Sequence, residues 1–192
     1  RDGRVNPIPA HDIPMVMLGT FVLAFGWFGF NAGSTLAGMD TRLAVVATNT
    51  MLASATGAFG AYVFARMKFG KPDPTWMANG MLAGLVAITA PCAFVSSWAA
   101  MVIGLVAGGL VILAAVFIDA KLRIDDPVGA IAVHGVNGAW GILALGLFAI
   151  FFLNGFLHLL LHDFVVPIMY KNRVKTGAAV SMFWPLFTSQ FI

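Results

Sequence analysis

Long apolar stretches without charge alternate with short charged ones along this chain. Residues 13–34 and 43–65 contain no charged side chain. Each is longer than the roughly 20 residues with which a helix crosses a hydrocarbon core of about 30 Å. Residues 75–118 are also uncharged, which is enough for two spans with a turn at Ser96–Ser97, just after Pro91. The pattern therefore predicts membrane-spanning helices at 13–34, 43–65, 75–95 and 98–118.

A further uncharged stretch begins at Pro127 and runs past Ala149. Asp126 followed by Pro127 is typical of a helix start, because an acidic side chain caps the first turn and proline is tolerated in it. We therefore expect a fifth helix at 127–149 and an all-α, polytopic transmembrane bundle over residues 1–149. Residues 150–192 stay apolar but include histidines, a proline and a basic cluster. We leave this segment unassigned, as an extra helix or as sequence of another origin.

Composition supports the membrane interpretation. Hydrophobic residues make up 60% of the 192 residues and charged residues only 10%, whereas an ordinary soluble domain has about 25% charged residues. This excludes a soluble globular domain, a disordered chain and a nucleic-acid-binding module. Cys92 is the one cysteine, so an intramolecular disulfide and a cysteine metal cluster are excluded, and we expect a buried thiol. No nucleophile–base pair or carboxylate pair falls inside a predicted span, so an enzyme is not expected.

The basic residues predict an orientation, because cytoplasmic loops of membrane proteins are enriched in lysine and arginine. If the helices alternate in direction, one side holds seven basic residues and the other, between helices, only Arg42. The seven are Arg1, Arg4, Arg66, Lys68, Lys71, Lys121 and Arg123. We therefore expect the N-terminal end of the chain in the cytoplasm. Since no charged-then-apolar leader follows Arg1, no signal peptide is expected there.

Two stretches carry candidate chemistry. In GWFGFNAGS, Phe30 and Ser34 are four residues apart on one helix face, so a ring face and a hydroxyl can meet a cation together; an aromatic belt at a helix end is the alternative. In DDPVGAIAVHGVNGAWG, His134 lies seven residues beyond Pro127, about 10 Å along a helix axis. An ionisable group at such depth is a functional candidate, although a structural histidine bonded to another helix is the alternative.

A third stretch, NGMLAGLVAITAPC, favours helix packing. Gly80 and Gly84 form a small-residue face, and Pro91 kinks or ends the helix. His158 and His162 have the i, i+4 spacing of metal ligands, but no acidic residue lies between them, and no metal site or cofactor is expected.

These three stretches, in this order and at these separations, resemble the ammonium transporter (Amt/Mep/Rh) family. The resemblance covers about Asn6 to Ala149. It implies one of two inverted five-helix repeats, helices six to ten, of an eleven-helix subunit that assembles as a homotrimer. It also implies a transporter in a membrane, with the bacterial inner membrane expected, whose partners are ammonium and ammonia, the lipid bilayer and a possible regulatory protein.

The resemblance further implies roles for individual residues. Ser34 matches an outer recruitment-site serine, and Phe30 matches one of two stacked gate phenylalanines. Leu23 would line the narrow apolar pore, and His134 matches the second of two paired pore histidines. Asp125-Asp126 matches an acidic pair for which we expect capping rather than substrate contact.

The implied mechanism is desolvation followed by conduction. A dry apolar pore makes bare K⁺ and Na⁺ costly, whereas ammonium can leave its proton behind and cross as ammonia past the histidine pair. The first repeat is missing from these residues, so we expect that the chain alone does not transport ammonium. A non-transporting fragment or an ammonium-sensing membrane module remains the alternative.

Overall fold

The computed structural model of this chain describes residues 8–161, 166–172, 175, 178 and 180–181. The described residues are mainly helical, and they contain no β-strand. The chain divides into two compact units, residues 1–146 and 147–192. The first unit holds the bundle, and the second contains the short helix α6 (Val166–Asn172). The all-α fold predicted from the sequence is confirmed.

Four long helices come first in the chain. They are α1 (Ile13–Gly33), α2 (Arg42–Phe69), α3 (Pro74–Thr89) and α4 (Ser97–Phe117). Two stretches with the wider turns of a π-helix follow, η1 (Ile118–Leu122) and η2 (Ile131–Val136), and η2 leads into α5 (Asn137–Leu159). In the part of the chain that the structure describes, four segments are long and apolar enough to cross a membrane: Ile13–Gly33, Arg42–Phe69, Ser97–Leu122 and Ile131–Phe148.

Local sequence explains where the first helices begin and end. The Asp12 carboxylate accepts a 3.0 Å hydrogen bond from the Met15 main-chain N–H at the start of α1. Asp73 caps α3 in the same way through the Thr75 N–H, at 2.8 Å. Helix α2 ends at Gly70, whose φ of 77° is readily adopted only by glycine. An acidic cap thus marks the start of α1, and Gly70 together with the Asp73 cap defines the connection between α2 and α3.

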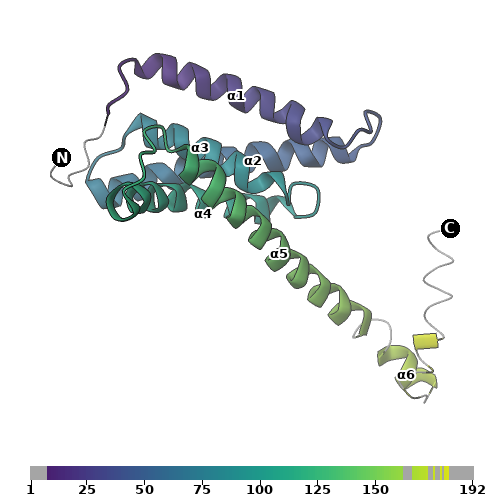
Figure 1. Cartoon of the computed structure of the whole chain (residues 1–192). Coiled ribbons are helices and arrows are strands. Elements are labelled where there is room, and N and C mark those ends of the chain that lie inside the picture. The colour runs from purple at the N-terminus through teal and green to yellow at the C-terminus, as the bar shows by residue number, and fades with distance from the viewer. Residues whose placement is uncertain (1–7, 162–165, 173–174, 176–177, 179, 182–192) are drawn as a thin grey trace. The chain divides into compact units, whose positions relative to one another are not determined.

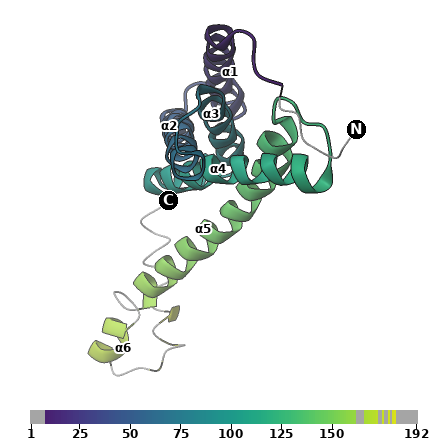
Figure 2. The ribbon, with the colours of Figure 1, turned by 90° about the vertical axis from the view of Figure 1, so that its left-hand side faces the viewer.

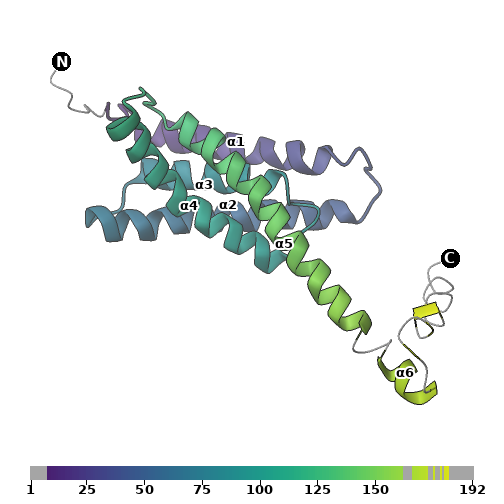
Figure 3. The same cartoon turned by 60° about the horizontal axis from the view of Figure 1, so that its bottom comes forward.

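Helix α2 forms the centre of the first unit and packs against both α3 and α4. Figure 1 shows α2 and α3 running alongside each other, and Figures 2 and 3 show α4 crossing them obliquely. The backbones approach so closely that a Cβ atom at Gly80, Gly84, Gly104 or Gly108 would overlap with atoms of α2. The packing role predicted for Gly80 and Gly84 is confirmed.

Helix α1 is much less enclosed than α2 and α4. It contacts α3 and α2, yet only Thr20, Ala24 and Asn31 along its length are buried. The Asn31 side-chain amide donates a 3.1 Å hydrogen bond to the Thr50 hydroxyl of α2 and so ties the C-terminal part of α1 to the bundle. Much of the apolar surface of α1 therefore stays uncovered within this chain.

The third helix is shorter than its uncharged interval predicts. Helix α3 ends at Thr89 rather than near residue 95, because Pro91 cannot continue the hydrogen-bond pattern. The following segment is held from α2, where the buried Asn49 amide donates to the carbonyl oxygens of Cys92 and Val95, each at 2.9 Å. Cys92 itself is a free, buried cysteine, as predicted.

The predicted helix start at Asp126 and Pro127 is wrong. Pro127 lies in a turn, Gly129 has a φ of 74°, and η2 begins only at Ile131. The chain reverses here because the left-handed conformation of Gly129 interrupts any helix that starts at the proline. His134 is therefore three residues from the start of η2, and the helical rise counted from Pro127 does not give its depth.

Candidate functional site

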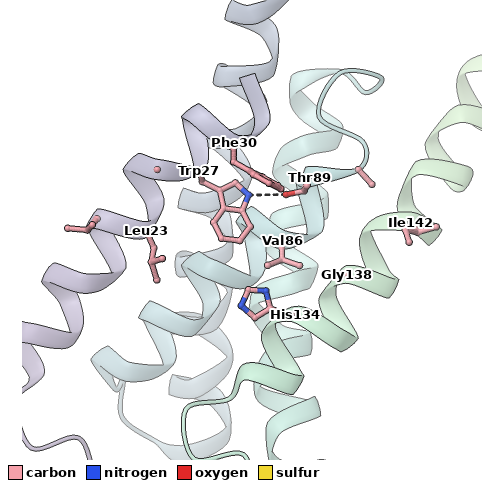
Figure 4. Close-up of a pocket in the computed structure, with 11 residues that line it drawn as sticks. Leu23, Trp27, Phe30, Val86, Thr89, His134, Gly138 and Ile142 are labelled. Atoms are coloured by element: carbon pink, nitrogen blue, oxygen red, sulfur yellow. Dashed lines mark hydrogen bonds between the residues drawn. The ribbon is translucent and has the colours of Figure 1, made fainter. Parts of the chain in front are cut away.

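A cavity of about 600 Å³ lies in the first unit, between α1, α3 and the η2–α5 segment. Its walls are apolar except for three groups: the Trp27 indole, the Thr89 hydroxyl and the His134 imidazole. In Figure 4 the Trp27 indole points toward Thr89 and lies near His134, and Leu23 and Phe30 project from the same helix as Trp27. An apolar cavity with a few convergent polar groups is typical of a binding site.

Helix α1 supplies one wall through regular spacing. Leu23, Trp27 and Phe30 occur at i, i+4 and i+7, which places them on one face of a helix. Leu23 is 51% exposed and Phe30 is 60% exposed, although both line the cavity. The α1 wall is therefore open on one side within this chain.

Trp27 is the best-connected residue of that wall. Its indole N–H donates a 2.9 Å hydrogen bond to the Thr89 hydroxyl of α3 (Figure 4). Its ring meets Phe30 edge to face, with 5.9 Å between ring centroids and 68° between planes. It also lies nearly parallel to the His134 ring, at 6.3 Å and 20°. Trp27 thus contacts the predicted gate residue Phe30 and the predicted pore residue His134, and it bonds to α3.

His134 projects from the π-helical segment η2. Such wide turns are frequent at functional sites because they change the direction of a side chain and loosen the main-chain hydrogen bonding. The Asn137 side-chain amide compensates locally by donating a 2.9 Å hydrogen bond to the Ala132 carbonyl oxygen. Among the residues that the structure describes, no hydrogen bond to the His134 ring is found, and the ring is exposed.

The acidic pair before η2 divides into two different environments. Asp126 is buried, with 7% of its surface exposed, and one of its oxygens accepts hydrogen bonds from the main-chain N–H groups of Ile131 (3.0 Å) and Ala132 (3.3 Å). Asp125 is exposed. The carboxylate of Asp126 therefore holds the start of the segment that carries His134.

Ser34 lies apart from the cavity. It follows the last residue of α1, is exposed, and donates its hydroxyl proton to the Phe30 carbonyl oxygen. Because that proton is committed, the lone pairs of the hydroxyl oxygen are left as acceptors. The structure therefore brings Leu23, Phe30 and His134 to one cavity and leaves Ser34 at the exposed end of the same helix.

One ion pair lies in the connection between α1 and α2. The Asp40 carboxylate accepts hydrogen bonds from the Arg42 side chain (2.7 Å) and main chain (2.8 Å). These bonds from the guanidinium and the main-chain N–H hold the pKa of Asp40 below its usual value.

Within the described residues, no cluster of three metal-ligating side chains is found. His162 and the side chain of His158 lie outside the described residues.

Sequence reasoning missed two members of the site, Trp27 and Thr89. The spacing of Leu23, Trp27 and Phe30 could have identified Trp27. The sequence signal for Thr89 is weaker, because it is only a hydroxyl residue in an apolar run just before Pro91. Nothing in the sequence pairs Thr89 with Trp27, which lies 62 positions earlier.

Comparisons with known proteins agree with this architecture. Residues 1–189 match the Ammonium Transporter Family, a range that includes most of the segment left unassigned above. The chain is 49% identical over 148 residues to the ammonium transporter Amt2 of Archaeoglobus fulgidus, covering 77% of this chain and 31% of that protein.

Two solved structures extend the likeness to the fold. A structure titled "Sensor Amt Protein" superposes with a TM-score of 0.74 and 44% identity, over 77% of this chain and 36% of that one. Mep2 of Saccharomyces cerevisiae superposes with a TM-score of 0.67 and 38% identity, over 72% of this chain and 32% of that one. This chain thus spans about a third of the length of these relatives.

The apolar helices and the shared fold together define an integral membrane protein of the polytopic, all-α class. More specifically, the chain belongs to the Ammonium Transporter Family. The family resemblance predicted from the three sequence stretches is confirmed.

Proposed function

We propose that this chain forms the second half of an ammonium-conducting pore within a longer membrane protein. The observation that carries the proposal is the apolar cavity on which Leu23, Phe30 and His134 converge. Membership of the Ammonium Transporter Family and the likeness to relatives named ammonium transporters support it. The complete protein, in this proposal, assembles as a homotrimer in the inner membrane, with the N-terminal end of this chain in the cytoplasm.

Recruitment of ammonium would begin at the outer end of α1. The Ser34 oxygen offers only lone pairs, because its proton is bonded to the Phe30 carbonyl, so it suits a cation that is purely a hydrogen-bond donor. The face of the Phe30 ring, which is 60% exposed, attracts the same cation one helical turn further in. Ser34 and Phe30 together therefore favour ammonium over an uncharged solute at the entrance.

Conduction past the entrance would require deprotonation. The cavity wall beyond Phe30 is formed largely by apolar side chains such as Leu23 and Val86, which cannot replace the hydration shell of an alkali cation. Ammonia lacks that cost, and the imidazole of His134 can both donate to it and accept from it. The first repeat of the complete protein would supply the second imidazole and the facing wall.

An ammonium-sensing module is the second candidate function. A specific observation favours it: the structure titled "Sensor Amt Protein" is 44% identical to this chain and superposes with a TM-score of 0.74. A sensor would keep the recruitment site formed by Phe30 and Ser34 and would bind ammonium without sustained flux. Measurement of flux therefore separates the two functions.

The test is ammonium uptake into proteoliposomes by the protein expressed from the complete open reading frame of its gene. We expect saturable uptake of ammonium with K⁺ flux at the level of protein-free vesicles. Ser34→Ala should raise the half-saturating ammonium concentration severalfold, because one acceptor at the entrance is lost. Ser96→Ala is the matched control, since Ser96 is an exposed serine at a helix end without a side-chain cap bond, and it should leave uptake unchanged.

Two outcomes would count against a transporter of this kind. Ammonium binding without flux would favour the sensor. Equal fluxes of ammonium and K⁺ would contradict conduction through a dehydrated apolar cavity.

A further inference from the structure

The Thr89 hydroxyl has both of its hydrogen-bonding roles assigned. It donates to the Leu85 carbonyl oxygen in its own helix, at 2.8 Å, and accepts from the indole N–H of Trp27 on α1, at 2.9 Å (Figure 4). A hydroxyl has a single proton, so donation to Leu85 directs the oxygen lone pairs to the indole. The bond therefore joins α1 to α3 at one defined point in the cavity wall.

This bond bears on His134 because the indole is the aromatic neighbour of the imidazole. The two rings are nearly parallel, with 20° between their planes and 6.3 Å between centroids. In the described part of the chain no hydrogen bond fixes the imidazole, and rotation about the terminal side-chain torsion of histidine is broad. Within this chain, the Trp27 indole is therefore the aromatic group that lies beside the His134 ring, and the Thr89 hydroxyl bonds to that indole.

We propose that Thr89 is a positioning residue that fixes the Trp27 indole beside His134 and thereby limits the size of the solute that reaches the imidazole. This inference rests on the proposed function and adds a determinant of specificity to it. Trp27 also meets Phe30 edge to face, so a shift of the indole alters the space on both of its sides. Without the Thr89 bond the indole can turn away, and the passage beside His134 admits an amine one methyl group larger than ammonium.

The chain offers a closely matched control for Thr89. Thr50 also donates to a carbonyl oxygen four residues earlier in its own helix, that of Val46 at 2.7 Å. It also accepts from a side chain of α1, the Asn31 amide at 3.1 Å. Unlike Thr89, however, Thr50 does not line the cavity. Removal of either hydroxyl eliminates a hydrogen bond between α1 and a neighbouring helix, but only the Thr89 hydroxyl bonds to Trp27.

The experiment compares uptake of methylammonium and ammonium by the complete protein in proteoliposomes, together with the indole ¹⁵N–¹H NMR signal of Trp27, assigned through Trp27→Phe. Thr89→Val should raise the methylammonium-to-ammonium uptake ratio at least threefold and shift the Trp27 signal. Thr89→Ser retains a hydroxyl and should restore both toward wild type. Thr50→Val should change neither, and Thr89→Val should have no further effect on the ratio in a Trp27→Phe protein.

Several results would overturn the inference. These are an unchanged ratio or an unmoved Trp27 signal in Thr89→Val, an equal rise of the ratio in Thr50→Val, and a persisting effect of Thr89→Val in the Trp27→Phe background. If the wild-type protein takes up neither amine, the proposed function fails instead. The NMR signal then decides by itself whether Thr89 holds Trp27.

Discussion

The carboxylate of Asp126 is the residue on which the local structure before His134 depends most directly. It is buried and accepts two main-chain N–H bonds at the first turn of η2, whereas its neighbour Asp125 is exposed. A helix start deprived of such a cap leaves donors without partners. The two carboxylates therefore make different contributions to the local structure, although they are adjacent in the sequence.

Asp126→Ala should lower the free energy of unfolding by about 1 kcal/mol, the typical effect of removing an N-terminal cap. The measurement is thermal unfolding of the detergent-solubilised protein, with Asp125→Ala as the control of equal charge change. We expect a lower melting temperature for Asp126→Ala and an unchanged one for Asp125→Ala. Equal shifts in the two variants would show that net charge, not the cap, is responsible.

Residue identities in the site were partly predictable. Phe30, Leu23 and His134 were selected from the sequence because of their spacing and resemblance, and all three line one cavity. The Trp27–Thr89 bond was not predictable, because it joins residues 62 positions apart and depends on how α1 packs against α3. Ser34 shows the converse, since a shared helix face with Phe30 did not bring its side chain to the cavity.

At the scale of elements, glycines determine how closely α2 and α4 approach. A Cβ atom at Gly108 would overlap with main-chain atoms of Gly57 and Ala61 in α2, whereas one at Gly109 would meet only the Phe64 ring, at 3.6 Å. The first contact involves backbone, which cannot move without shifting the helix, and the second is an ordinary van der Waals distance. Neighbouring glycines thus differ sharply in their tolerance of a methyl group.

Gly108→Ala should therefore destabilise the bundle by about 2 kcal/mol, within the range measured for overpacked interiors. Gly109→Ala adds the same methyl group one position along α4 and should be neutral or slightly stabilising, since alanine favours a helix over glycine. Thermal unfolding in detergent measures both. A neutral Gly108→Ala would contradict the close approach of the two helices.

Helix starts followed from the sequence pattern better than helix ends: α4 begins at Ser97, within one residue of the predicted interval, whereas α2 runs to Phe69, beyond the predicted end at residue 65. Helix α1 (Ile13–Gly33) and α2 (Arg42–Phe69) begin within one residue of the predicted intervals. The end of α3 and the start of η2 did not follow, because both are decided by single residues inside uncharged stretches, Pro91 and Gly129. The π-helical geometry of η2 gave no sequence signal at all, since it reflects the cap of Asp126 and the bond made by Asn137.

At the scale of the whole molecule, the cavity lacks one wall within this chain. Leu23 and Phe30 line it yet remain more than half exposed, and the chain spans about a third of the length of its relatives. An apolar conduit open on one side cannot exclude water or hydrated cations. That residues 1–192 alone do not transport ammonium therefore stays a prediction, and the pore proposal concerns the complete protein.

The central claim is that the imidazole of His134 faces the path of ammonia. Its most direct test is the initial rate of ammonium uptake by the complete protein with His134→Ala, measured beside His11→Ala in proteoliposomes. His11 is an exposed histidine that precedes α1. The control substitution therefore removes the same kind of side chain at a position outside the cavity. We predict a rate at least tenfold below wild type for His134→Ala and a wild-type rate for His11→Ala; wild-type uptake by correctly folded His134→Ala protein would contradict the account.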